Sequence, residues 1–142
     1  IDHLKIDTQG SELEIIKGAN SILNSVRSLE VEVEFNPIYE GQPVFSDVDK
    51  YLRIQGFVLW KFSNTVHYSK RKKAARKIGQ DIICYDDFKL IDVEVYAGQI
   101  YWANAHYVRA EIVRKSHLQT PNQRDRDRAL FDALGMPDVT ET

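Results

Sequence analysis

The chain has 142 residues, of which 43% are hydrophobic, 28% charged and 11% aromatic. This composition excludes a disordered tail, a collagen-like repeat and a coiled coil, and no apolar run approaches the roughly 20 residues of a membrane span. The net charge of -2 argues against a protein dedicated to coating nucleic acid. The single cysteine, Cys84, cannot form an internal disulfide, which favours a reducing compartment such as the cytoplasm.

The first elements lie within residues 3–24. Residues 3–7 form a short strand-like run, and the segment from Asp7 to Gly10 is typical of a turn. The spacing of Ser11 and Glu14 predicts a capping box, in which Ser11 caps a helix and Glu14 reaches back to it. Apolar residues then recur at helical spacing through about residue 24.

The next segment alternates between apolar and acidic residues over positions 29–35, which predicts a strand. A loop with two prolines follows over residues 36–45. Ser46 and Asp49 then repeat the capping pattern and predict a helix that ends at Gly56.

Residues 57–62 predict a third strand, and the basic run 70–77 that follows is typical of a solvated excursion. Two further strands are expected over residues 90–96 and 100–108, and a helix over 124–134. The alternation of strands and helices predicts an α/β fold with a parallel sheet and an antiparallel element at its end. We expect residues 1–120 to form one domain, followed over residues 121–142 by a polar tail with a short helix.

Carboxylates occupy one face of a strand that a helix-covered parallel sheet would normally keep apolar. Glu30, Glu32 and Glu34 share that face, and Lys5 and Asp7 share one face of the first strand. We therefore expect the two strands to be parallel neighbours with these side chains on one face. Two interpretations stay open: Lys5 pairs with a glutamate for structural reasons, or the side chains line a cleft at the carboxyl edge, where open α/β sheets bind ligands.

The segment from Asp2 to Ala19 reads D-H-L-K-I-D-T-Q-G-S-E-L-E-I-I-K-G-A. It resembles the hallmark segment of the FkbM family of S-adenosylmethionine-dependent methyltransferases, D-x-L-K-I-D-V-E-G-x-E-x-x-V-L-K-G-A. The likeness continues through residues 32–35, 39–45 and 49–57. The segment 102–109, W-A-N-A-H-Y-V-R, is similar to the family's W-x-D-A-x-F-x-R ending. The resemblance spans roughly residues 1–109.

The resemblance implies a Rossmann-like class I methyltransferase sheet with the strand order 3-2-1-4-5-7-6. Residues 3–7, 29–35 and 57–62 would be its fourth, fifth and sixth strands, and residues near 104–108 its antiparallel seventh. The glycine-rich cofactor loop would precede Ile1, because no G-x-G pattern follows a strand in this sequence. We therefore expect the C-terminal half of an enzyme, which by itself binds the cofactor weakly and is inactive.

Two positions depart from the family pattern. Gln9 stands where the family has an acid, and Asn104 where it has an aspartate. Both changes remove a carboxylate, although an amide can still bond a hydroxyl. The resemblance implies that Asp7, Gln9 and Gly10 contact S-adenosylmethionine.

Methyl transfer requires a positioned group that takes up the proton of the acceptor. We predict Asp7 as this catalytic group and Glu34 as the second candidate. Asp7 has an alternative interpretation as a simple turn-former. The side chains expected to contact the substrate are Lys5, Glu32, Tyr39, Gln42 and Asn104.

The leading hypothesis is O-methylation of a hydroxyl on a sugar, a glycan or another small molecule. The loop 36–45 would overhang that substrate, or would be a plain surface loop. Methylation of nucleic acid or protein through the basic run is an alternative, as is a non-catalytic module that pairs through an exposed sheet edge. We predict no metal, because the four histidines lack metal-ligand spacing, and His106 is interpreted as a packed or surface residue.

Overall fold

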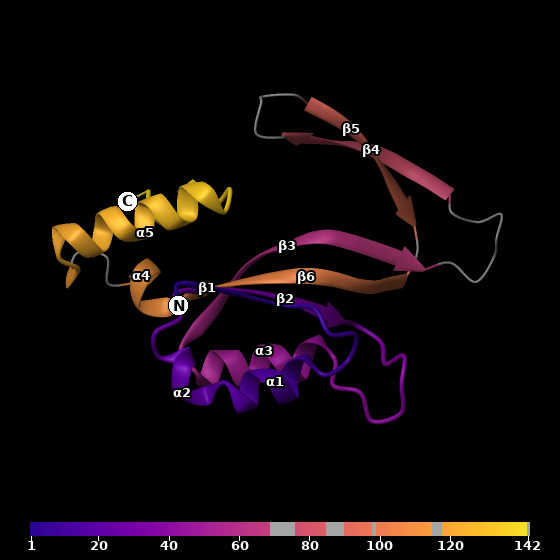
Figure 1. The fold of residues 1–142 in the computed structure, drawn as a ribbon. Helices are drawn as coiled ribbons and strands as arrows, with labels where there is room; N and C mark the ends of the chain where they lie inside the picture. The colour runs from indigo at the N-terminus through magenta and orange to yellow at the C-terminus, as the bar shows by residue number, and fades with distance from the viewer. Residues whose placement is uncertain (69–75, 85–89, 98, 115–117, 142) are drawn as a thin grey trace.

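The computed structural model describes residues 1–68, 76–84, 90–97, 99–114 and 118–141, and most of the basic run 70–77 lies outside them (Figure 1). The described elements, in chain order, are β1 (His3–Ile6), α1 (Glu12–Gly18), α2 (Asn20–Leu23), β2 (Ser28–Glu34), α3 (Phe45–Ile54), β3 (Phe57–Tyr68), β4 (Arg76–Cys84), β5 (Leu90–Ala97), β6 (Gln99–Arg109), α4 (Ala110–Arg114), α5 (Pro121–Ala133) and the short 3-10 helix η2 (Pro137–Val139). None of these helices is long and apolar enough to cross a membrane.

The main sheet has four strands in the order β1-β2-β6-β3. This is the order expected for the fourth, fifth, seventh and sixth strands, so the predicted α/β class and strand order are confirmed for the described part. β1 and β2 are parallel neighbours, as predicted, whereas β6 runs antiparallel to both β2 and β3. The sheet is therefore mixed, with a single parallel pair among its described strands.

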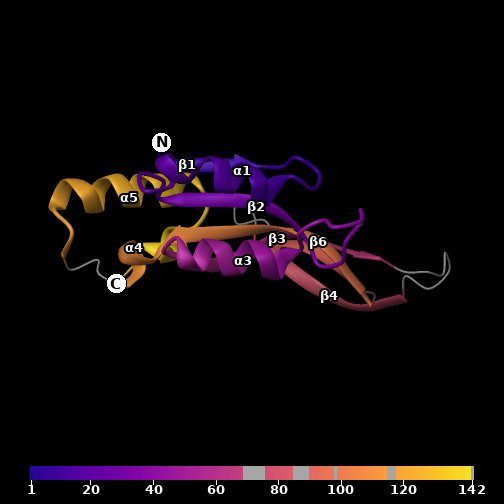
Figure 2. The ribbon, with the colours of Figure 1, turned by 90° about the horizontal axis from the view of Figure 1, so that it is seen from below.

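The three helices α1, α2 and α3 cover one face of this sheet (Figures 1 and 2). The apolar residues of β2 point into that side, where the largest core of the described residues forms. Its fully buried members include Ile16, Leu29, Val31, Leu52 and Tyr107. Burial of each such side chain stabilises the fold by roughly 1.5–3 kcal/mol. The packing of these apolar side chains therefore holds the three helices on this face of the sheet.

The opposite face of the sheet is covered by helices at one end of its strands and carries polar side chains at the other. At one end, α4, α5 and η2 pack against Val108 of β6 and form a second core with Phe131 and Met136 (Figure 1). An ion pair between Arg27 and the fully buried Asp127 joins α5 to the start of β2. At the other end, the glutamates of β2 face side chains of β6.

Arg109 joins the ends of two helices to the sheet. Its guanidinium donates to the carbonyl oxygens of Leu23, at the end of α2, and of Gln55, the cap of α3 at 2.8 Å. The group also lies 3.9 Å from the centre of the Phe57 ring. Helix ends leave carbonyl oxygens without partners, and a cation there is favourable. The arginine of the predicted family ending is thus a structural anchor.

The first helix begins after Ser11 as predicted, but its predicted capping box is absent, and the predicted start of the second helix was wrong. Ser11 makes no side-chain cap, and the first helix is divided at Ala19 into α1 and α2. The second helix starts at Phe45, before Ser46, because the carboxylate of Asp47 accepts the backbone N–H of Val44 at 3.0 Å. An acid at the third helical position satisfies one of the unpaired donors of a helix start.

The strands differ from prediction in the middle of the chain. β3 extends to Tyr68, and β4 was not predicted, because Gly79 and the charged residues at its start obscure the strand pattern. The strand predicted at 90–96 is present as β5, but it pairs with β4 in a separate two-stranded sheet. The last helix begins at Pro121, earlier than predicted, after a capping box between Thr120 and Gln123.

Candidate functional site

The turn after β1 is held by Glu12, which sequence analysis did not single out. This carboxylate is buried and accepts hydrogen bonds from the backbone N–H of Thr8 at 2.8 Å, from its hydroxyl at 3.0 Å and from the N–H of Gly10 at 3.0 Å. The turn includes Gln9 at φ 59° and Gly10 at φ 120°, conformations that these bonds stabilise. The side chains of Asp7 and Gln9 are left exposed at the carboxyl end of β1.

Gln9 links the two neighbouring strands at this edge. Its amide nitrogen donates to Glu32 Oε1 at 2.8 Å and to Asp7 Oδ1 at 3.2 Å. Asp7 is exposed, whereas Glu32 is only 8% exposed. A neutral double donor between two carboxylates allows both to stay close, which an acid at position 9 would oppose.

The two inner glutamates of this edge hold their protons more strongly than usual. Burial raises the pKa of Glu32, and the charges of Asp7 and Glu12 raise it further. Burial likewise raises the pKa of Glu34, which is 2% exposed, and Glu12 again adds to the rise. Carboxyl groups whose pKa values are raised by burial and by neighbouring carboxylates are a common feature of functional sites.

A second cluster of polar side chains forms around Glu30, which lies two residues before Glu32 on β2. Lys5 Nζ lies 2.8 Å from Glu30 Oε1, and the side-chain amide of Asn104 donates to the same oxygen at 2.8 Å. Although burial would raise the pKa of Glu30, the bond from Lys5 and the charge of His106 lower it. Lys5 therefore lies on the glutamate face, as predicted, but in a structural pair with Glu30 and not beside Glu32.

His106 extends this second group and was not predicted as a site residue. The antiparallel register sets it opposite Glu30, with Nδ1 4.0 Å from Glu30 Oε2. Its Nε2 lies 2.6 Å from the hydroxyl oxygen of Ser63. Burial lowers the pKa of His106, so the neutral ring is favoured at neutral pH. Within the described ranges, no three histidine, cysteine or acidic side chains are placed to hold a metal ion.

The loop between β2 and α3 folds over the turn at Gly10. Gln42 Oε1 accepts the backbone N–H groups of Ile38 at 2.8 Å and of Tyr39 at 3.2 Å. Its Nε2 is buried without a hydrogen-bond partner among the described residues, and it would lie 3.0 Å from a Cβ at position 10. Gln42 thus holds the loop against a position that requires glycine, while Tyr39 is 61% exposed.

The three residues predicted to contact the cofactor differ in how much space a ligand would find beside them. Asp7 and Gln9 present an exposed carboxylate and amide that fit the hydroxyl and amino groups of a nucleoside. At Gly10 the space beside the backbone is taken by Gln42. The hydrogen bonds therefore divide the polar side chains into two groups, one that joins Asp7, Gln9 and Glu32 and one that joins Glu30, Lys5 and Asn104.

Residues 1–59 match the model of the Methyltransferase FkbM domain. The FkbM resemblance is confirmed over these residues, which carry the Asp7 turn and the glutamates of β2. The match supports methyltransferase activity. Residues 60–142, with Asn104 and His106, lie outside it. No curated protein and no solved structure matches the chain.

The FkbM pattern contained a signal for Glu12 that the sequence analysis did not use. Glu12 is the second glutamate of that pattern, but its spacing suggested no role because its partners include the backbone N–H groups of Thr8 and Gly10. His106 falls on a variable position of the FkbM ending. Only the register between β2 and β6 brings it to Glu30.

Proposed function

We propose that β1, β2, β3 and β6 are the last four strands of a Rossmann-like methyltransferase that uses S-adenosylmethionine. The acceptor is a hydroxyl of a sugar, a glycan or another small molecule. The observation that carries the proposal is the bridge from Gln9 to Asp7 and Glu32, inside the segment matched to the FkbM domain. The bridge lies at the carboxyl edge of two parallel strands, where open α/β sheets bind ligands.

Asp7 takes the acceptor's proton in this mechanism. Asp7 and Gln9 are the residues that would hold S-adenosylmethionine, which would supply an electrophilic methyl group and leave as S-adenosylhomocysteine when its carbon–sulfur bond breaks. The exposed carboxylate of Asp7 accepts a hydrogen bond from the acceptor hydroxyl and receives its proton as the new oxygen–carbon bond forms. The amide of Gln9, bonded to Asp7 Oδ1, keeps that carboxylate aimed in one direction.

The buried glutamates act behind Asp7. Glu32 is bonded to the same amide, so it fixes the orientation of Gln9. Glu34 is covered in this arrangement and is the second proton acceptor only if the loop at Gln42 moves aside. Tyr39 is the exposed side chain of that loop and the one we propose to contact the acceptor.

The single cysteine, Cys84, supports a cytoplasmic location.

The test compares Asp7→Asn with Glu14→Gln in the full-length enzyme that contains this chain, assayed with labelled S-adenosylmethionine and a panel of hydroxyl acceptors. Both changes remove one charge and keep the shape of the side chain. Asp7→Asn is expected to lower kcat about a hundredfold or more, because an amide cannot take up the proton. Glu14 is exposed in the first turn of α1, so Glu14→Gln should cost less than about 1 kcal/mol of stability and leave kcat unchanged.

Circular dichroism of both variants verifies that each one is folded. If Asp7→Asn retains near-normal turnover in the folded protein, Asp7 is a turn-former, and Glu34 becomes the candidate. If the wild-type protein methylates no hydroxyl acceptor but modifies nucleic acid or protein, the proposed substrate class is wrong.

A further inference from the structure

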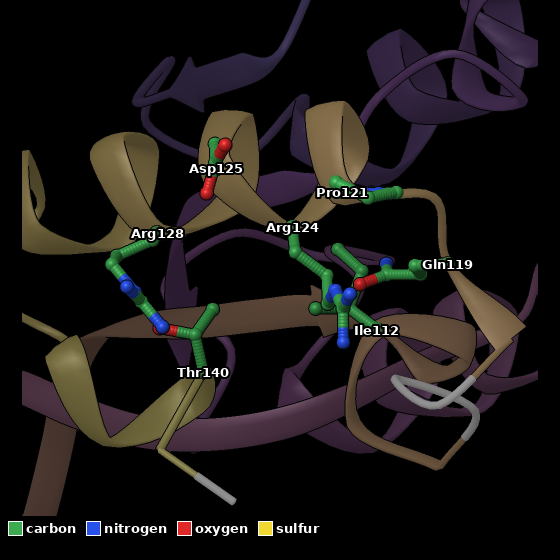
Figure 3. Close-up of a pocket in the computed structure, with 7 residues that line it drawn as sticks. All are labelled: Ile112, Gln119, Pro121, Arg124, Asp125, Arg128 and Thr140. Atoms are coloured by element: carbon green, nitrogen blue, oxygen red, sulfur yellow. The ribbon is translucent and has the colours of Figure 1, made fainter.

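A pocket of about 410 Å³ lies beneath α5, away from the proposed methyltransferase site (Figure 3). None of the predicted site residues lines it. The helix packs on Val108, which is paired with Ser28 at the start of β2, whereas Asp7 follows the last residue of β1 and Glu32 lies near the end of β2. The pocket is therefore at the opposite edge of the sheet.

The charged side chains near the start of α5 lie on different sides of the helix. Residues 124–128 read Arg-Asp-Arg-Asp-Arg. Asp127 is buried against Arg27, and Arg126 forms an ion pair with Asp2. Arg124 and Arg128 are one turn apart on another side of the helix, where side chains at i and i+4 are neighbours. The buried ion pair holds the helix so that these two arginines face the pocket.

The guanidinium groups of Arg124 and Arg128 both point into the pocket (Figure 3). Neither forms an ion pair with a carboxylate in the part of the chain that the structure describes, whereas Arg27, Arg53 and Arg126 each do. Two like charges at this spacing repel each other and destabilise a helix. A bound anion would remove that repulsion.

Acidic side chains near the pocket are placed mostly at its margins. The carboxylate of Asp125 lies on the helix, away from both guanidinium groups (Figure 3). Asp132 and Glu141 line a neighbouring hollow that shares Arg128 and Thr140 with the pocket. Asp125 is the carboxylate-bearing residue among the described residues that line the pocket, and its side chain points away from the two guanidinium groups (Figure 3).

Neutral side chains complete the lining of the pocket. Gln119 gives one N–H of its amide to Asp127 at 2.8 Å, which fixes the group and leaves its second N–H available. The hydroxyl of Thr140 donates to the carbonyl oxygen of Pro137 at 3.2 Å and lies next to the end of Arg128, where its oxygen can only accept (Figure 3). Ile112 and Pro121 add apolar surface on which an organic group attached to an anion can rest.

We propose that this pocket binds a phosphate group, held between Arg124 and Arg128. Planar guanidinium groups match phosphate oxygens through paired, charge-assisted hydrogen bonds. The phosphate is free or is carried by a small ester, and both share this chemistry. The site is independent of the methyl-transfer site, since no side chain is common to the two.

The test is calorimetric titration of the protein at low salt with inorganic phosphate and, separately, with glycerol 1-phosphate. The wild-type protein is expected to bind one equivalent with a millimolar or lower Kd. Tighter binding of glycerol 1-phosphate would identify an ester as the ligand, and equal or weaker binding would identify free phosphate. In the Arg124→Gln, Arg128→Gln double variant the Kd should rise about tenfold or more, and added salt should weaken wild-type binding.

The matched control is Arg53→Gln, which removes an exposed arginine that is paired with Asp49 on α3. It should leave the Kd unchanged. Arg124→Lys keeps the charge without the planar fork and should weaken binding several-fold, so it tests the geometry even if the double variant fails to fold. The proposal is overturned if the wild-type protein shows no saturable binding, or if Arg53→Gln weakens binding as much as the pocket variants.

Discussion

Gln9 donates its side-chain amide to Glu32 at 2.8 Å and thereby joins the turn after β1 to the neighbouring strand β2. The same nitrogen reaches Asp7 at 3.2 Å. The FkbM pattern quoted above has an acid at this position. A glutamine here replaces a repulsion between carboxylates with two hydrogen bonds, so the exact placement of Asp7 depends on an uncharged residue 9.

The variant Gln9→Glu tests this dependence. A third carboxylate should raise the pKa of Glu32 beyond its already raised position and destabilise the fold at neutral pH by about 1 kcal/mol. A carboxyl group whose pKa is higher in the folded state binds more protons when folded, so stability falls as pH rises above about 4.5. The variant should therefore lose more stability than wild type between pH 5 and pH 7.5 in urea unfolding.

Asn20→Asp is the matched control, because it adds the same charge at an exposed position at the start of α2. Its pH dependence should follow wild type. Equal slopes for Gln9→Glu and Asn20→Asp would mean that residue 9 does not act through Glu32.

His106 should produce a pH dependence of the opposite sign. Burial lowers its pKa, with the charge of Glu30 opposing the fall and those of Lys61, His3 and Lys5 adding to it. A histidine whose folded pKa is below its unfolded value near 6.5 makes stability fall as pH decreases through that value. His106→Asn should flatten this decline between pH 7 and pH 5.

Ser63→Ala provides the comparison for that experiment. It removes the contact at His106 Nε2 but keeps the titrating ring, so the decline with falling pH should remain. Direct titration of the His106 ring by NMR measures the same quantity. A ring pKa at or above 6.5 in the folded protein would contradict the expected direction.

Asp127→Asn should release the last helix from the sheet. The carboxylate is fully buried and bonded to Arg27 and Gln119, so its neutral replacement leaves the partly buried guanidinium of Arg27 without its counter-ion. The expected loss is about 3 kcal/mol or more in urea unfolding. The fluorescence of Trp60, whose indole N–H donates to Asp138 at 3.0 Å, should report the loosening. Asp132→Asn, at an exposed position of α5, should change stability by less than about 0.5 kcal/mol.

Glu12→Gln should destabilise the turn that carries Asp7. The carboxylate accepts hydrogen bonds from the backbone N–H and the hydroxyl of Thr8 through Oε1, and from the backbone N–H of Gly10. In Glu12→Gln the NH₂ group of the amide would face one of these donors, and that hydrogen bond would be lost. The expected cost is about 1–3 kcal/mol. Urea unfolding measures it, and a loss no larger than that of Glu14→Gln would show that the buried bonds do not hold the turn.

Local pattern was sufficient for much of this protein. Strict alternation over residues 29–35 determined that Glu30, Glu32 and Glu34 share one face, because side chains of a strand alternate regardless of what surrounds them. The order of strands and helices indicated an α/β fold, and the segment from Asp2 to Ala19 indicated the FkbM family. These properties depend on periodicity and on contiguous residues, which a single sequence contains.

Only the tertiary structure decided which polar groups meet. The pairing of β2 with β6 brings Asn104 and His106 to Glu30 across 74 and 76 positions of chain, and the parallel register sets Lys5 level with Glu30 and not with Glu32. A shift of either register by one residue would turn each side chain to the other face. The register is set by the packing of whole strands between helices and by distant turns, so no local stretch of sequence determines these partners.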